Sequence, residues 1–172
     1  VYIGSTWMEV SVSSPNLGNS NAGVRGLFMG GHDGSATRTD RIDFITIPSA
    51  GDATDFGDIT QARSAAAAVA SNTRAMLLGG TLSPTVDTVD YVTISITSDA
   101  IDFGNLTSSR HWTQGCSSQT RGIAAGGHPG QNVIDYCTIA STGDFKDFGD
   151  LTYKSNTAVS ANSSIQSPTR GI

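Results

Sequence analysis

The chain has 172 residues, and its 10 basic and 15 acidic side chains give a formal net charge of −5 at pH 7. This length corresponds to one domain that is large enough to bury a hydrophobic core. Because the basic residues are spread singly along the chain, no patch could neutralise a run of phosphates, and nucleic acid is not expected as a partner. No apolar run approaches the roughly 18 to 20 residues that span a bilayer, so membrane insertion is not expected either.

Ser, Thr, Asp and Gly dominate the polar residues, whereas Glu9 is the single glutamate and Lys146 and Lys154 are the only lysines. Glu and Lys are typical of helix surfaces, while Ser, Thr, Asp and Gly favour turns and caps. The composition therefore predicts an all-β protein.

Residues 1–24 form the first predicted unit, which is a partial one. Thr6–Ser11 aligns with the later block Asp55–Thr60, so that Trp7 takes the place of Phe56. The alignment predicts the later strands of a repeat unit that the chain enters part-way.

Three repeats follow, over residues 25–73, 74–120 and 121–169, and residues 170–172 begin another. Each repeat starts with an Arg, a short apolar run and a Gly pair, as in RGLFMGG, RAMLLGG and RGIAAGG. An Asp, an aromatic residue and a β-rich run come next, as DFITI, DYVTI and DYCTI. The third block reads DFGDIT, DFGNLT or DFGDLT, and a Ser/Ala-rich stretch follows it.

The period of 47 to 49 residues between the repeated arginines indicates the architecture. Four short β-like segments per unit match one four-stranded antiparallel propeller blade, whereas a solenoid coil would need about half this period. The fold class expected is all-β, a β-propeller of about four blades forming one domain over residues 1–172. The inner strand of each blade is expected to precede the Gly pair, as at Leu27–Met29, where small residues allow close backbone approach.

The two partial units at the ends predict how such a propeller closes. Ser167–Ile172 repeats the start of a blade, and pairing it with the N-terminal segment would remove strand edges that otherwise recruit other chains. We expect this pairing within one chain or with a neighbouring copy. The alternative is a fragment of a longer propeller.

The repeated DFGD block favours a structural role. Its first Asp is expected to cap a tight turn, its Phe to fill the space between blades and its Gly to take a positive φ. Phe56, Phe103 and Phe148 are therefore expected at equivalent buried positions. The alternative is a calcium site, although calcium needs six to eight oxygens and usually a tighter loop of ligands.

Arg25, Arg74, Arg121 and Arg170 recur before the apolar run of each unit. We expect one ion pair with a recurrent Asp in each blade, or contacts with carbonyl groups at strand ends. An arginine ring that binds an anionic sugar in a central channel is the alternative.

Loop residues that do not repeat are the candidates for ligand contacts. This set is His32, Arg38, Arg41, His111, Trp112 and His128. The histidines are expected to face solvent without a metal, because His32 and His128 lie in non-adjacent repeats and zinc ligands must converge within about 4 Å. Trp112, which replaces Ala66 of the preceding repeat, is a natural platform for stacking a sugar.

No catalytic residue, metal site or cofactor is predicted, and we expect the protein not to be an enzyme. The sequence lacks a nucleophile elbow, a P-loop and a dinucleotide motif. Cys116 and Cys137 align with apolar strand positions of the other repeats and are expected to be small core residues.

The Gly pair after a short apolar run, with two later aromatic residues, resembles the kelch repeat, although Phe replaces the usual Trp. SPTRGI at Ser167–Ile172, DYVTIS at Asp90–Ser95 and DFGDLT at Asp147–Thr152 are similar to the repeat proteins of marine tailed phages. That resemblance covers nearly the whole chain from Arg25 onward. It implies a viral protein of the virion, a structural, decorating, tail-fibre or host-attachment module.

The expected partners are other virion proteins, copies of the chain itself and a host-surface glycan. The alternative function is a carbohydrate-binding or carbohydrate-cleaving β-propeller that uses the loop residues named above. A carbohydrate-cleaving site would need two carboxylates about 5 to 9.5 Å apart, and the sequence does not single out such a pair.

Overall fold

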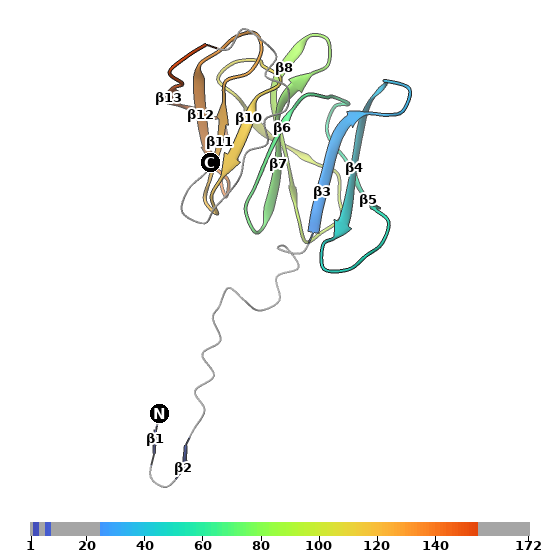
Figure 1. Ribbon diagram of the computed structural model, residues 1–172, viewed down its shortest axis with the longest axis vertical. Coiled ribbons are helices and arrows are strands. Elements are labelled where there is room, and N and C mark those ends of the chain that lie inside the picture. Colours follow the sequence, from blue (N-terminus) through green and yellow to red (C-terminus); the bar gives the residue numbers. More distant parts are fainter. Residues whose placement is uncertain (1, 4–5, 8–24, 155–172) are drawn as a thin grey trace.

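The regular structure of the chain is entirely β in the computed structural model, which describes residues 2–3, 6–7 and 25–154. Two short strands, β1 (Tyr2–Ile3) and β2 (Thr6–Trp7), pair with each other in antiparallel fashion. The other strands form three antiparallel sheets that follow one another along the chain (Figure 1). The all-β prediction is confirmed for this part of the chain.

The three sheets have their strands in chain order. The first contains β3 (Arg25–His32), β4 (Arg38–Thr46) and β5 (Thr54–Asp58). The second contains β6 (Ala67–Ala70), β7 (Arg74–Thr81), β8 (Thr85–Thr93) and β9 (Ile101–Asn105). The third contains β10 (Gln114–Ser117), β11 (Arg121–Ala125), β12 (Val133–Thr138) and β13 (Lys146–Asp150).

The Gly pair marks an irregularity in β3 and in β7, whereas β11 ends just before its Gly pair. The register between β7 and β8 shifts between Leu78 and Gly80. Gly79 has a φ of +58°, and a Cβ atom there would lie 2.5 Å from the Arg110 carbonyl oxygen. Only glycine allows both this left-handed backbone and this close approach.

The first strand of each full sheet comes from the end of the preceding repeat. β7 is paired with β6 on one side and with β8 on the other, so in the full sheets the stretch before the Gly pair is not the edge strand that an inner strand would be, and the prediction was wrong there. In the first sheet, Leu27–Met29 lies in β3, at the edge of the three described strands. The Ser/Ala-rich stretches supply β6 and β10, and these two strands lie against each other. The Ser117 hydroxyl donates to the Ala70 carbonyl oxygen at 2.8 Å, and a Cβ at Gly115 would lie 2.9 Å from the Ala68 carbonyl oxygen.

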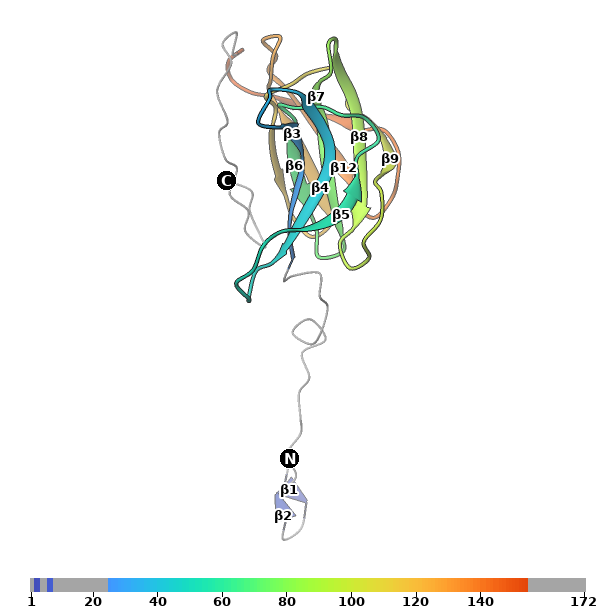
Figure 2. The same cartoon turned by 90° about the vertical axis from the view of Figure 1, so that its right-hand side faces the viewer.

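Hydrophobic side chains fill the two junctions between neighbouring sheets. The second sheet lies between the other two (Figure 1), and in the view turned by 90° the first sheet faces the viewer (Figure 2). The core of the first junction is Ile42, Phe56, Ile59, Ala75, Leu77, Val92 and Ile94. The core of the second junction includes Met76, Leu78, Val89, Phe103, Leu106, Ala124, Cys137, Ile139 and Phe145. We call the face of a sheet that packs on the preceding sheet its leading face, and the opposite face its trailing face.

The Phe residues of the DFG blocks lie on trailing faces, with different outcomes. Phe56 and Phe103 are 3% and 2% exposed, as predicted. Phe148 is 55% exposed, so the prediction that it is buried was wrong. The cause is positional: Phe56 and Phe103 are each covered by the following sheet, and no described strand follows β13.

The predicted closure of the ends falls on Ser167–Ile172 and on most of residues 1–24, which lie outside the described residues. The stretch of the chain described here contains no helix of the length and apolarity needed to cross a membrane.

Candidate functional site

A polar clasp joins each sheet to the next at the edge of the hydrophobic junction. In the first junction, Thr60 follows the DFG block of the first sheet and binds Asp90 on β8 of the second. Its backbone N–H donates to Asp90 Oδ2 at 3.1 Å and its hydroxyl to Oδ1 at 2.8 Å. The Arg63 guanidinium lies 3.0 Å from the same carboxylate, and both side chains are fully buried.

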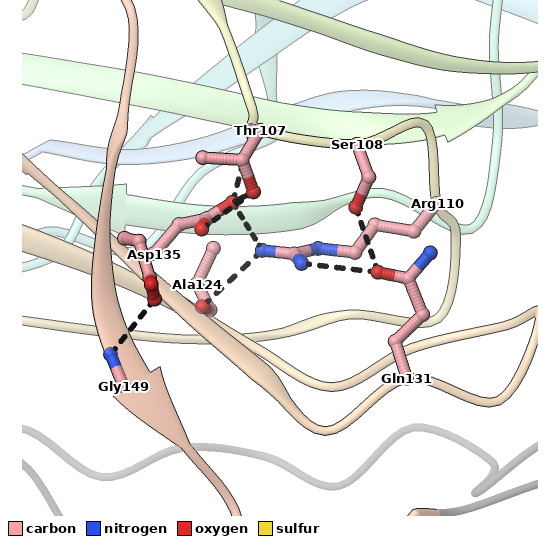
Figure 3. Close-up of polar contacts among 8 residues, drawn as sticks. Thr107, Ser108, Arg110, Ala124, Gln131, Asp135 and Gly149 are labelled. Carbon is pink, nitrogen blue, oxygen red and sulfur yellow. Dashed lines mark hydrogen bonds and ion pairs between the residues drawn. The ribbon is translucent and has the colours of Figure 1, made fainter.

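The second junction repeats this clasp with Thr107, Arg110 and Asp135 (Figure 3). The Thr107 hydroxyl donates to Asp135 Oδ1 at 2.7 Å, and the Arg110 guanidinium donates to Oδ2 at 2.7 Å. Arg110 also reaches the Ala124 carbonyl oxygen at 3.4 Å and the Gln131 amide oxygen at 3.5 Å. Burial lowers the pKa of the Arg110 guanidinium, and the neighbouring Asp135 carboxylate opposes this effect.

The arginines of these buried ion pairs, Arg63 and Arg110, are not the repeated arginines for which ion pairs were predicted. Arg25 and Arg74 each donate from Nη1 to a carbonyl of the following sheet, at 2.8 Å from Ile94 and 2.8 Å from Ile139. Their guanidinium groups also lie over the rings of Phe44 and Tyr91, at 4.6 and 4.5 Å from the ring centroids. The contact with strand-end carbonyls is confirmed, whereas the ion pair at these arginines was a wrong prediction.

The aspartates of the DFG blocks make local hydrogen bonds that shape the turn. Asp102 Oδ1 accepts the N–H of Gly104 at 3.2 Å, and Asp147 Oδ1 accepts that of Gly149 at 2.9 Å. Both glycines have a φ near +140°, at +141° and +142°. The predicted roles of the first Asp and of the Gly are confirmed in these two blocks. In the described stretches, no group of three or more His, Cys, Asp or Glu side chains converges as metal ligands do.

Chelation is therefore expected to leave the fold unchanged. The Asp102 and Asp147 carboxylates accept hydrogen bonds from N–H groups, and calcium would need six to eight converging oxygens. The thermal midpoint measured by circular dichroism should be the same with EDTA and with added calcium. A drop of several degrees on chelation would contradict the structural role of these aspartates.

Three of the six candidate ligand residues come together between the second and third sheets. The rings of His111, Trp112 and His128 are in mutual contact, with centroids 4.5 Å apart for His111 and Trp112, 4.8 Å for the two histidines and 5.8 Å for Trp112 and His128. His111 and His128 form an antiparallel bridge that extends the ladder of β10 and β11. We call these three residues the imidazole–indole cluster.

The backbone presents the indole of this cluster to solvent. Trp112 has a φ of +52° and is 41% exposed. The backbone N–H of Trp112 donates to the Ala65 carbonyl oxygen at 2.7 Å, and Ala65 has a φ of +57°. Trp112 therefore corresponds to Ala65 of the preceding repeat and not to Ala66 as aligned from the sequence.

The two imidazoles of the cluster are half-buried, which differs from the solvent-facing histidines that were predicted. The Thr85 hydroxyl lies 3.0 Å from His111 Nδ1. His128 Nδ1 is buried and has no hydrogen-bond partner. Burial, and secondarily the proximity of His128, lowers the pKa of His111. The cluster is thus an aromatic surface in which His128 Nδ1 has no hydrogen-bond partner.

The pH dependence of the cluster follows from this shift. Because folding holds His111 neutral, its contribution to stability is complete above the pKa of an unfolded histidine and is lost as the pH falls below it. In a Trp7→Phe, His128→Asn background, which leaves His111 as the histidine of the cluster that contacts the indole, the Trp112 fluorescence should change with a midpoint below the usual histidine value. His111→Asn should abolish that transition. A midpoint at the usual value, or one that survives His111→Asn, would contradict the argument.

The other three candidate residues lie on the first sheet, away from the cluster in the sheet order. His32 is exposed and faces Arg38 across the hairpin of β3 and β4. Arg41 is an exposed residue whose Nε lies 3.7 Å from Asp43. They therefore do not belong to the imidazole–indole cluster.

The two cysteines are free thiols. Cys137 is part of the core of the second junction, as predicted, and burial raises the pKa of its thiol to about 11. Cys116 is half-buried and lines a cavity of about 340 Å³ between β3, β6 and β10. Arg25 is the one charged residue that lines this cavity, so the described part of the chain forms no arginine ring there.

Comparison with protein-family models gave no match for this chain, and comparison with curated proteins gave no significant match.

Proposed function

We propose that the protein is a non-enzymatic structural module of a phage virion, in which the three sheets are blades of a kelch-like β-propeller. The observation that carries the structural role is the use of the repeated charged residues. Arg63, Asp90, Arg110 and Asp135 are fully buried in contacts between sheets. Groups buried in this way hold neighbouring repeats in register and are not accessible to a substrate.

The resemblance to repeat proteins of marine tailed phages supports the location on the virion, in a tail fibre or another surface appendage. The exposed turns between strands are rich in Ser, Thr and Gly, which suit wet polar contacts with other virion proteins or with a host surface. Decoration, tail assembly and host attachment are the roles that fit such a surface.

Immunogold labelling of purified virions tests this proposal. An antibody raised against the whole chain should label intact particles of the phage that encodes it, on the tail or on another appendage. Virions lacking the gene are the matched control. Absence of the protein from purified virions, with the protein found only in the lysate of infected cells, would contradict the proposed location.

The imidazole–indole cluster favours carbohydrate binding as a second candidate function. An indole that is 41% exposed, next to two imidazoles and a hydroxyl, offers a flat apolar surface with hydrogen-bonding groups at its side. The described contacts of the cluster involve no carboxylate, so binding is better supported than cleavage. We therefore propose host-glycan contact as the role of this surface if the module attaches to cells.

A glycan array separates the two candidates. If the cluster binds a sugar, the whole chain should bind particular glycans, and Trp112→Ala should reduce the signal at least tenfold. Tyr153→Ala is the matched control, because Tyr153 is an exposed aromatic residue, at 63%, on another part of the chain. Binding that Trp112→Ala leaves unchanged, or no binding at all, would contradict the carbohydrate-binding role.

A further inference from the structure

The leading face of the first sheet carries hydrophobic residues that no described sheet covers. Phe28 is 58% exposed and Ile47 is 63% exposed. Their equivalents on the leading face of the second sheet, Leu77 and Ile94, are 4% and 3% exposed, because the first sheet packs on them. The leading face of the first sheet is thus exposed, whereas the leading face of the second sheet is buried in a junction.

The trailing face of the third sheet is uncovered in the corresponding way. Phe148, at 55% exposure, is the equivalent of the buried Phe56 and Phe103. A Cβ on Gly57 or Gly104 would lie 2.5 or 2.6 Å from the backbone of the following sheet, whereas a Cβ on Gly149 would meet nothing within 4 Å. The surface that receives a following sheet is therefore present on the third sheet and unoccupied by described residues.

The internal junctions also share a pair of polar contacts. In the first, Asp99 Oδ1 accepts the Asp58 N–H at 3.1 Å, and the Ala100 N–H donates to the Asp58 carbonyl oxygen at 2.7 Å. In the second, Asp144 Oδ1 accepts the Asn105 N–H at 2.9 Å. The Phe145 N–H donates to the Asn105 carbonyl oxygen at 2.8 Å, as the Ala100 N–H does to Asp58.

The two uncovered faces carry the matching halves of these contacts. The sequence register places Asp52 and Ala53 of the first sheet where Asp99 and Ala100 stand in the second. Asp150 of the third sheet stands where Asp58 stands in the first. The leading face of the first sheet thus has the accepting carboxylate, of Asp52, and the donating N–H, of Ala53. The trailing face of the third sheet has the backbone N–H and carbonyl oxygen of Asp150, which are the groups that they would bind.

The clasp residues are divided between the same two faces. Asp43, the equivalent of Asp90 and Asp135, has a side chain that is 36% exposed, and its one described partner is Arg41, at 3.7 Å. Thr152 is exposed at the position of the clasping Thr107. Arg121 lies over the Tyr136 ring, as Arg74 lies over Tyr91, but it donates to no carbonyl oxygen of a following sheet within the described part of the chain.

We propose that the trailing face of the third sheet docks on the leading face of the first sheet of a second copy of this chain. The contact reproduces the aromatic packing and the threonine–aspartate contact of the two internal junctions, with Phe148 packed on Phe28 and Ile47, and Thr152 bound to Asp43. Because the third repeat has Ser155 in place of the clasp arginine, the cation beside Asp43 is Arg41 of the same sheet. The interface joins two different faces, so repeated docking gives a ring if the rotation closes and a filament if it does not. This inference does not depend on the virion location.

A complementation experiment with two variants of the whole chain tests the docking. Phe148→Asp places a charge in the trailing face of the third sheet and should prevent it from docking. Ile47→Asp does the same to the leading face of the first sheet. By light scattering after size exclusion, the wild-type chain should show a mass of at least two copies that rises with concentration. Each variant alone should have the mass of one chain. An equimolar mixture should form a dimer and go no further, because each variant retains the face that the other lacks.

A third variant controls for the loss of an exposed hydrophobic side chain elsewhere on the molecule. Ile96→Asp changes an equally exposed hydrophobic residue, at 62%, on neither face, and should assemble as the wild type does. If circular dichroism shows that either variant is unfolded, Phe148→Ser and Phe28→Ser are the milder pair. A wild-type chain that stays monomeric at every concentration would overturn the proposal. A dimer that survives in both single variants would overturn it as well, since it would use another surface.

Discussion

Replacing Arg110 by alanine is expected to lower the free energy of unfolding by about 3–5 kcal/mol, because it leaves the Asp135 carboxylate buried with no opposite charge. Both side chains are fully buried, and the Arg110 guanidinium lies 2.7 Å from Asp135 Oδ2. Thr107 would still donate to the carboxylate, but two hydrogen bonds from a neutral residue do not replace a cation in a fully buried site. Urea unfolding of the whole chain, followed by circular dichroism, measures this loss.

The chain offers a graded set of controls for this effect. Arg63→Ala should also be strongly destabilising, but less so than Arg110→Ala, because Arg63 Nη1 lies 3.0 Å from Asp90 without a well-aligned hydrogen bond. Arg41→Ala should cost no more than about 1 kcal/mol, since this exposed pair is separated by 3.7 Å. If Arg110→Ala and Arg41→Ala lower the free energy of unfolding equally, burial does not determine how much these ion pairs stabilise the fold.

Much of the fold was open to prediction from the repeats. The three sequence blocks of each unit correspond to three strands, and the Gly pair and the DFG glycines have the positive φ that their residue type indicates. Periodicity does not show where a structural unit begins, because a repeat can be cut at any point without changing its period. The pairing of Ala67–Ala70 with the strand that follows it, and not with its own repeat, was therefore missed.

The polar contacts between sheets were harder to predict, because their partners come from different repeats. Arg63 and Arg110 lie three residues after the Thr of the DFG block, a spacing visible in the sequence. The third repeat has Ser155 at that position, and the spacing therefore did not stand out. His111 and His128 are equivalent to the bridged pair Ser64 and Thr81, and their contact follows only once β10 is known to pair with β11.

Phe103→Ala is expected to lower the free energy of unfolding by about 3–5 kcal/mol, the usual cost of a cavity left by a buried aromatic ring. The Phe103 ring is 2% exposed and packs edge-to-face on Tyr91 of its own sheet and on Phe145 of the next, with centroids 5.8 and 6.3 Å apart. It therefore contributes to the second junction as well as to the packing within its own sheet. Urea unfolding provides the measurement.

Phe148→Ala is the matched control, because it removes the same side chain from the same position of the repeat. Its ring also packs edge-to-face on a tyrosine of its own sheet, Tyr136, at 5.9 Å, but it is 55% exposed. Below the concentration at which copies associate, its truncation should cost about 1 kcal/mol or less. As the concentration rises through the range of association, the difference between Phe148→Ala and the wild type should grow, because docking buries this ring. If Phe148→Ala is instead as costly as Phe103→Ala in the monomer, something other than a following sheet stabilises the DFG rings, and the equivalence of the junctions fails.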